Sequence, residues 1–249
     1  MISHDHTLPD TSVTGHTFKC YDDELQTLRD LVAEMEHSVL AQVSDTLLSL
    51  TNKDINLACS ILRVENRVNA KELNIDAKIL EIIARRGPVG KDLRTIVAMS
   101  KVVVDLERIG DEAARIASIV LDVYGSNMLE PNSQLFRDVQ EMGTLAIETL
   151  QQAIIIYDTL DGEAAHNLRA ETSRLEDIFK AGLRRLMTYV MEDSRNIGFM
   201  VHMVLAMKAY ERIAAHAHNL AEFVIYQVEG TDIRHQSIES APDVSDNPN

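Results

Sequence analysis

The stretch DLERIGDEAARIA, residues 105–117, returns 104 positions later in altered form as AYERIAAHAHNLA, residues 209–221. The triplet Glu-Arg-Ile and two later alanines recur in register, whereas Ala215 stands where the first copy has Asp111. A phrase that recurs at a long spacing indicates duplication of a structural unit. The sequence therefore predicts two copies of one unit that differ at a polar position.

The composition is that of an all-helical protein. The chain has 249 residues with only 10 Gly, 5 Pro and no Trp. Between Phe18 and Gly230 the apolar residues recur mostly at three- and four-residue intervals, as they do on helices. Breaker segments divide this pattern into six predicted helices; they lie at residues 52–54, 87–92, 124–133, 161–162 and 192–196.

Long helices joined by short connections pack as antiparallel bundles. We therefore predict an all-α fold of two tandem antiparallel three-helix bundles, with Asp92 as the N-cap of the third helix. The predicted order is a flexible N-terminal tail (1–17), a first bundle (18–124), a linker (125–132), a second bundle (133–230) and a flexible C-terminal tail (231–249).

The formal net charge of −15 excludes several classes of function. A nucleic-acid-binding protein needs a basic face, and anionic lipid repels an acidic protein, so we expect neither kind of binding. The sequence has no signal-peptide pattern and no apolar run of 18 residues. Two cysteines, Cys20 and Cys59, form no CxxC pair. We expect a soluble cytoplasmic protein that meets the membrane only through its partners.

The repeated phrase places two acids beside a core face. On its helix, Glu107 and Asp111 are four residues apart, at the boundary of a face formed by Leu106, Ile109, Ala113, Ile116, Ala117 and Val120. The preceding helix has a core face of Ile61, Val64, Val68, Ile75, Ile79 and Ile82. Along one edge of that face runs a row of oxygen-bearing side chains: Glu65, Asn69, Glu72 and Asp76.

This row is about 16 Å long at the rise of a helix. Like charges four residues apart cost a helix a few tenths of a kcal/mol unless a cation lies between them. Two antiparallel helices with facing acidic rows form a hard-ligand site for a divalent or trivalent metal such as iron, zinc, manganese or magnesium. The alternative interpretation is a solvated acidic face with no metal.

Other motifs give weaker indications. Two ExxH motifs, Glu34/His37 and Glu163/His166, have the spacing of ferritin-like di-iron sites, but two matches are close to the number that chance gives. We expect His216 and His218 to be surface or boundary residues. The pairs at 85–86 and 184–185 are arginines near helix ends, where cations offset the helix dipole. No catalytic motif is recognised, and we expect no enzymatic activity.

Taken together, six segments resemble the PhoU family, which comprises accessory and regulatory proteins of bacterial phosphate-specific transport. They are ENRVNAKELNID (65–76), IIARRGPVGKDLR (82–94), DLERIGDEAARIA (105–117), LMTYVMEDSRNI (186–197), YERIAAHAHNLAEFVIYQVEG (210–230) and TDIRH (231–235). The resemblance implies two three-helix bundles that regulate rather than catalyse. It implies binding to the ATPase of a phosphate ABC transporter and to a sensor histidine kinase, dimerisation, and repression of the phosphate-starvation response when phosphate is plentiful.

Some family members bind metal clusters through paired E(D)xxxD motifs, one cluster in each bundle. By position, the first bundle matches with Glu65, Asn69, Glu72, Asp76, Glu107 and Asp111, and Arg108 and Gly110 complete the family phrase. The second bundle retains Glu176 and Glu211 but has Thr172 and Ala215 where acids are expected. We therefore expect the second site to be degraded, with His216 as a conceivable substitute ligand that would favour a softer metal.

Two alternative functions remain open at this point. A carboxylate-cluster metal enzyme or metal-storage protein would use the same acidic residues for redox chemistry or accumulation. A helical scaffold without metal would not depend on Glu107 and Asp111 at all.

Overall fold

Helices make up nearly all of the described chain. The computed structural model describes residues 12–125, 133–170, 172–192 and 197–231, with side chains for all of these except residues 12–20, 133–135, 170, 172–176, 190 and 192. Seven helices follow one another in these ranges: α1 (Ser12–Asn52), α2 (Ile55–Arg86), α3 (Gly90–Gly125), α4 (Ser133–Thr159), α5 (Gly162–Ala170), α6 (Thr172–Glu192) and α7 (Ile197–Glu229).

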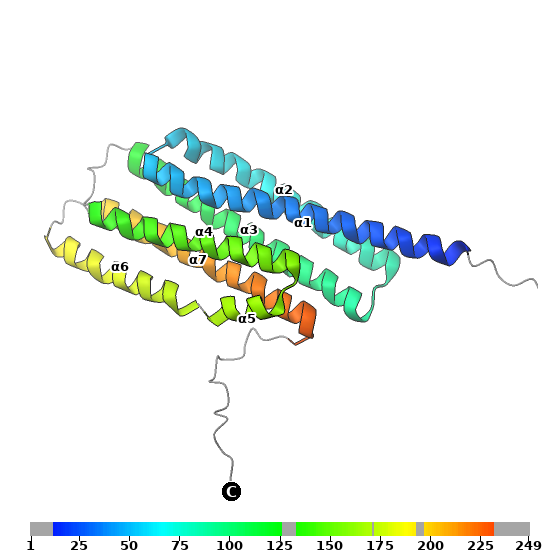
Figure 1. Ribbon diagram of the computed structural model, residues 1–249. Helices are drawn as coiled ribbons and strands as arrows, with labels where there is room; N and C mark the ends of the chain where they lie inside the picture. Colours follow the sequence, from blue (N-terminus) through cyan, green and yellow to red (C-terminus); the bar gives the residue numbers. More distant parts are fainter. Residues whose placement is uncertain (1–11, 126–132, 171, 193–196, 232–249) are drawn as a thin grey trace, which may run out of the picture.

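The helices form two bundles that lie side by side (Figure 1). Helices α1, α2 and α3 form the first bundle, and α4 to α7 form the second, in which α5 and α6 follow one another along the outer side. Helices α3 and α7 pack against each other where the bundles meet. The predicted all-α fold of two tandem three-helix bundles is confirmed, with α5 and α6 together in the place of one predicted helix.

The helix boundaries agree with the breaker segments except at the starts of α1 and α3 and at the unpredicted break between α5 and α6. Asp54 caps α2 and accepts a hydrogen bond from the backbone N–H of Leu57 at 2.9 Å. Gly87 ends α2 with a left-handed φ of 54°. Helix α3 begins at Gly90, so the prediction that Asp92 is its N-cap is wrong, and Asp92 lies in the first turn. Helix α1 begins at Ser12, inside the segment 1–17 that was predicted as a tail. The predicted domain boundaries all stay predictions.

The predicted core faces are confirmed. All six apolar residues assigned to the core face of α3 are buried, and five of the six on α2 are buried, with Val64 partly buried against the core. Helices α3 and α7 are buried around much more of their circumference than α2, because each packs within its own bundle and against the other bundle. No helix in the described ranges has the length and apolar character that a membrane crossing requires.

Each bundle contains an arginine–carboxylate pair that joins two of its helices. Arg86 of α2 donates two hydrogen bonds to Glu24 of α1, both 2.8 Å long. Arg185 of α6 donates two to Asp138 of α4, at 2.9 and 2.7 Å. Bidentate pairs of this kind are stronger and more directional than single ion pairs. The helix-dipole explanation of these arginines is therefore incomplete, since both hold helices together.

Buried acids of α3 are paired with bases of α7 where the bundles meet. Asp105 lies 2.7 Å from Nδ1 of His216, and Glu112 accepts a hydrogen bond from Arg212 at 2.8 Å. Asp105 and Glu112 are 4% and 5% exposed, so both charges need partners. Position 216 is the counterpart of position 112 at the repeat spacing of 104 residues. The partner of Asp105 is therefore a histidine at a position where the first copy has an acid.

A buried hydrogen bond between Tyr210 of α7 and Thr46 of α1 also joins the two bundles. Thr46 Oγ1 of α1 donates to the carbonyl of Val43 at 2.6 Å, so the hydroxyl of Tyr210 donates to Thr46 Oγ1 over their 3.0 Å separation. We predict that Tyr210→Phe lowers the free energy of unfolding by about 1 to 2 kcal/mol, because it removes this buried hydrogen bond without opening a cavity. Urea denaturation measures the change.

The control is Tyr226→Phe, which removes a hydroxyl from a partly exposed ring. Equal free energies of unfolding for wild type and Tyr210→Phe would contradict the prediction.

Candidate functional site

The acidic row of α2 and the acidic pair of α3 lie close enough for their charges to interact. Burial is the main cause of a raised pKa for Glu65, Glu72 and Glu107. The negative charge of Asp111 raises all three further, and Asp76 adds to the effect on Glu72. The structure therefore brings five of the six predicted residues of the first site into one cluster of like charges, which we call the first acidic cluster.

Gly110 lets the two helices approach at this cluster. A Cβ atom at position 110 would lie 3.0 Å from Oε2 of Glu65 and 3.4 Å from Oε1 of Gln42. Real Cβ atoms rarely approach other atoms so closely, so a larger residue here would displace the Glu65 carboxylate. Close packing of Gly110 against Glu65 and Gln42 thus explains why the repeated phrase has a glycine at this position.

Gln42 of α1 is part of the site, although the sequence analysis did not find it. Its amide nitrogen donates to Glu65 Oε2 at 2.9 Å and to the carbonyl of Gly110 at 3.4 Å. Gln42 is buried in the core stripe of α1, beside Val39 and Val43. A glutamine inside an apolar stripe is the one signal that could have indicated it, because a buried amide needs polar partners.

Three oxygen atoms at the cluster are buried without a hydrogen-bond donor among the described residues. They belong to Gln42 (Oε1), Glu65 (Oε1) and Asn69 (Oδ1). Asn69 lies beside Glu65, whose pKa it lowers slightly through a hydrogen bond. A buried acceptor without a donor costs about 1 to 3 kcal/mol, and a bound hard cation would remove that cost. The residues present therefore fit a cation with oxygen ligands.

The cluster is not a finished coordination sphere. Within the described residues, no group of three or more His, Cys, Asp or Glu side chains is arranged to hold a metal ion. The side chains of Glu72, Asp76 and Glu107 are partly exposed and can rotate, whereas Glu65 is held by Gln42. Coordination by several carboxylates would therefore require rotation of the outer acids toward the held oxygens. The assignment of a metal to these residues stays a prediction.

The second copy of the site has a different charge balance. Lys208 forms an ion pair with Glu211 and also lies 5.3 Å from the ring centroid of Phe179. The position that corresponds to Lys208 in the first copy is Val104. Glu176 belongs to α6, but its side chain lies outside the described residues. In this bundle a lysine of the chain supplies the positive charge beside the retained glutamate.

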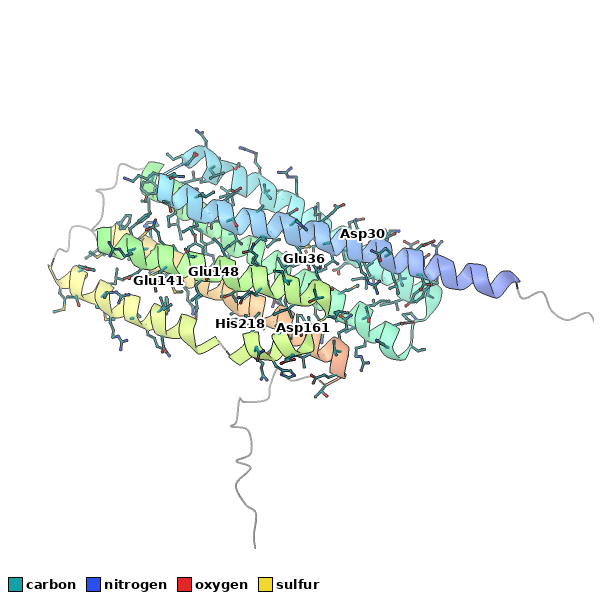
Figure 2. All side chains as sticks on the ribbon, viewed as in Figure 1. Asp30, Glu36, Glu141, Glu148, Asp161 and His218 are labelled. Carbon is teal, nitrogen blue, oxygen red and sulfur yellow. The ribbon has the colours of Figure 1, made fainter. Side chains whose placement is uncertain are left out.

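The histidines do not complete a metal site among the described residues. Nδ1 of His216 contacts Asp105 of the other bundle, and the role of His216 as a substitute ligand beside Glu211 stays a prediction. His218 is 6% exposed and contacts the carbonyl of Ala214 at 2.7 Å, so it is not the surface or boundary residue that was predicted (Figure 2). His37 contacts the carbonyl of Ala33, and His166 contacts Glu229. The two ExxH motifs therefore face different partners.

Comparison of the chain with known proteins gives consistent matches. The family model described as the PhoU domain matches residues 32–120 and 139–224. The phosphate-specific transport system accessory protein PhoU homolog of Pseudomonas aeruginosa is 34% identical over 224 residues, which cover 90% of this chain and 91% of the relative. The phosphate-specific transport system accessory protein PhoU of Escherichia coli K12 is 31% identical, with the same coverage of both chains.

Solved structures agree with these matches. The crystal structure of PhoU from Pseudomonas aeruginosa superposes with a TM-score of 0.81 at 34% identity and covers 85% of this chain and 100% of that one. The crystal structure of the phosphate transport system regulatory protein PhoU from Streptococcus pneumoniae superposes with a TM-score of 0.76 at 24% identity, covering 85% and 98%. The second similarity supports the fold alone.

The raised pKa values of the cluster determine how stability depends on pH. Because the folded-state pKa values of Glu65, Glu72 and Glu107 lie above the ordinary value of 4.5, the native state binds more protons than the unfolded chain above that pH. We predict that the free energy of unfolding in EDTA falls as pH rises from 4.5 through the raised values. Glu107→Gln/Asp111→Asn should reduce this fall and stabilise the protein at pH 7 by a few tenths of a kcal/mol per removed repulsive pair.

Denaturant titrations at pH 5 and pH 7 measure the effect. Glu81→Gln is the control, because Lys78 and Arg85 lower the pKa of Glu81 and its charge is attractive rather than repulsive. Equal pH slopes for wild type and the double variant would show that the acids do not repel one another.

Proposed function

The chain belongs to the PhoU family, and from that premise we propose that it is the accessory protein of a phosphate-specific transport system. The proposal rests on relatives with that description at 31% and 34% identity over nine-tenths of the chain. Their match extends over both bundles, so it is not confined to one repeat. In this role the protein acts by binding other proteins and not by catalysis.

Its regulatory action is part of the proposal. The protein keeps the phosphate-starvation response off when phosphate is plentiful, and it does so in the cytoplasm by binding the transporter ATPase and a sensor histidine kinase. We further propose that it works as a homodimer. The net charge of −15 supports protein partners over nucleic acid or anionic lipid.

The first acidic cluster contributes a metal site to this function. Glu65, Asn69, Glu72, Asp76, Glu107 and Asp111 hold a divalent or trivalent cation, with Gln42 fixing Glu65. The observation that carries this step is the set of buried, unpaired oxygens beside mutually repelling carboxylates. The cation neutralises the negative charge of the cluster and so changes which partner proteins this surface can bind. Glu211 and Glu176 form at most a weak second site, because Lys208 already neutralises Glu211.

A titration with Mn²⁺ tests the metal step. We predict that EDTA-treated wild type has a saturable Mn²⁺ site that Glu107→Gln/Asp111→Asn removes or weakens at least 100-fold, because two of the ligand charges are lost. Glu211→Gln is the matched control in the second copy and should leave this site unchanged. An unchanged number and affinity of Mn²⁺ sites per chain in the double variant, or an equal loss in Glu211→Gln, would contradict the site assignment.

A phosphate-starvation reporter tests the regulatory step. In excess phosphate the reporter should be on in a strain that lacks the protein and off when wild type is restored. Reporter activity with Glu107→Gln/Asp111→Asn then shows whether the cluster takes part. A silent reporter in the deletion strain would refute the regulatory function and favour the metal-enzyme or storage alternative, for which oxygen turnover or uptake of many iron ions per chain is the direct assay.

A further inference from the structure

A second set of unpaired polar atoms lies between the two bundles, separate from the first acidic cluster. These atoms line a cavity of about 100 Å³. Its walls come from α1, α3, α4 and α7, so both bundles contribute. Glu36 lies on the side of α1 that faces the second bundle (Figure 2). The polar lining consists of Arg29, Glu36, Tyr157, Asp158 and Gln227.

Glu36 is the centre of this cavity. Its side chain is 1% exposed, and neither carboxylate oxygen has a hydrogen-bond donor among the described residues. Burial, together with the smaller effect of the nearby Asp158, raises its pKa to about 8. An unpaired carboxylate that is this deeply buried is costly, and structures retain such groups when a ligand or a proton neutralises them.

Two more acceptors point to the same space. Gln227 is 6% exposed, and its amide nitrogen donates to Thr95 Oγ1 at 3.4 Å, which leaves the buried Oε1 unpaired. Tyr157 is 8% exposed, and its hydroxyl also has no hydrogen-bond partner among the described residues. Burial is the main cause of the raised pKa of this phenol, and the negative charge of Glu36 adds to it. The buried atoms without a partner in this cavity are therefore two carboxylate oxygens, an amide oxygen and a phenol hydroxyl, and the basic side chain of the lining is the exposed Arg29.

A proton shared by Glu36 and Asp158 removes one negative charge and supplies a single donor. The other buried oxygens of the cavity need a further partner, which a hydrated cation supplies.

We propose that this cavity binds a hard divalent cation, Mg²⁺ or Ca²⁺, between Glu36 of α1, Asp158 of α4 and Gln227 of α7. The carboxylates of Glu36 and Asp158 outnumber the single basic side chain of the lining, Arg29, so the site attracts a cation. An amide oxygen is a favourable neutral ligand for a divalent ion. The volume accommodates the ion with two or three waters, at about 30 Å³ per water. An anion is disfavoured by the two carboxylates. Because the ligands come from both bundles, the bound ion ties the bundles together.

The test uses the full chain in the Glu107→Gln/Asp111→Asn background, so that the first acidic cluster does not contribute. EDTA-treated protein is titrated with Mg²⁺, Ca²⁺ and, as a spectroscopic probe, Mn²⁺. We expect one ion per chain and a rise in Tm of roughly 5 °C or more at a concentration about 100 times Kd. Adding Glu36→Gln should weaken binding at least tenfold and abolish the rise in Tm.

The variants separate ligation from structure. Glu36→Gln removes a buried charge with little change of shape, so we expect a higher Tm than the parent in EDTA together with loss of the cation response. Asp158 is exposed at the rim of the cavity, so Asp158→Asn should not disturb folding. This variant should also lose affinity, and it keeps the test valid if Glu36→Gln does not fold. Glu148→Gln, an exposed acid of α4, is the control and should bind like the parent.

Three results would overturn the proposal. They are the absence of saturable binding of all three divalent ions, equal affinity in the Glu36→Gln or Asp158→Asn variant and the parent, and stabilisation by K⁺ or ammonium only. Since the assay is independent of the reporter strain and of the first acidic cluster, its failure leaves the proposed function unaffected.

Discussion

The packing of α3 against α7 is the constraint on which the rest of the structure depends. Each of these helices is buried within its own bundle and again against the other, so little of its surface is left for solvent. Small buried side chains allow the close contact: Ala98, Ala113 and Ala117 on α3, and Ala206, Ala209, Ala214, Ala217 and Ala221 on α7. The two copies of the repeated phrase lie on these helices. This location explains why the phrase persists in the second copy although Asp111 has no counterpart there.

Polar groups at the joint follow from the same constraint. Asp105 and Glu112 are buried when the bundles meet, and each has a basic partner on α7. At the repeat spacing, His216 corresponds to Glu112 and Ala209 to Asp105. The change from an acid to a histidine at position 216 thus gives Asp105 a partner where the first copy would have presented a second acid. The partner of Glu112, Arg212, is the unchanged counterpart of Arg108 and needed no such change.

The sequence predicted the features that depend on periodicity and missed those that depend on contacts between distant helices. Three- and four-residue spacing placed the core faces of α2 and α3 correctly, and breaker residues located most helix ends. The acidic row of α2 and its proximity to α3 could be predicted because both are regular. Gln42 and Glu36 could not, since each is a single polar residue in an apolar stripe and its role depends on a partner from another helix. His216 is the boundary residue that was expected, but its partner Asp105 is 111 residues away and could not be predicted.

The ion pair between Lys208 and Glu211 has a consequence for how the two halves of the molecule respond to their surroundings. A lysine is covalently attached and cannot dissociate, so the charge beside Glu211 is the same whatever ions the solution contains. The position equivalent to Lys208 beside Glu107 is Val104, and the nearby Arg108 only partly offsets the charges of Asp111, Glu72 and Glu65 there. With the cation proposed for the first acidic cluster, one half of the molecule would have a fixed charge and the other a charge that depends on the ions in solution. A partner protein that contacts both halves would then respond to the ions in the cell through the difference in surface charge between the two halves.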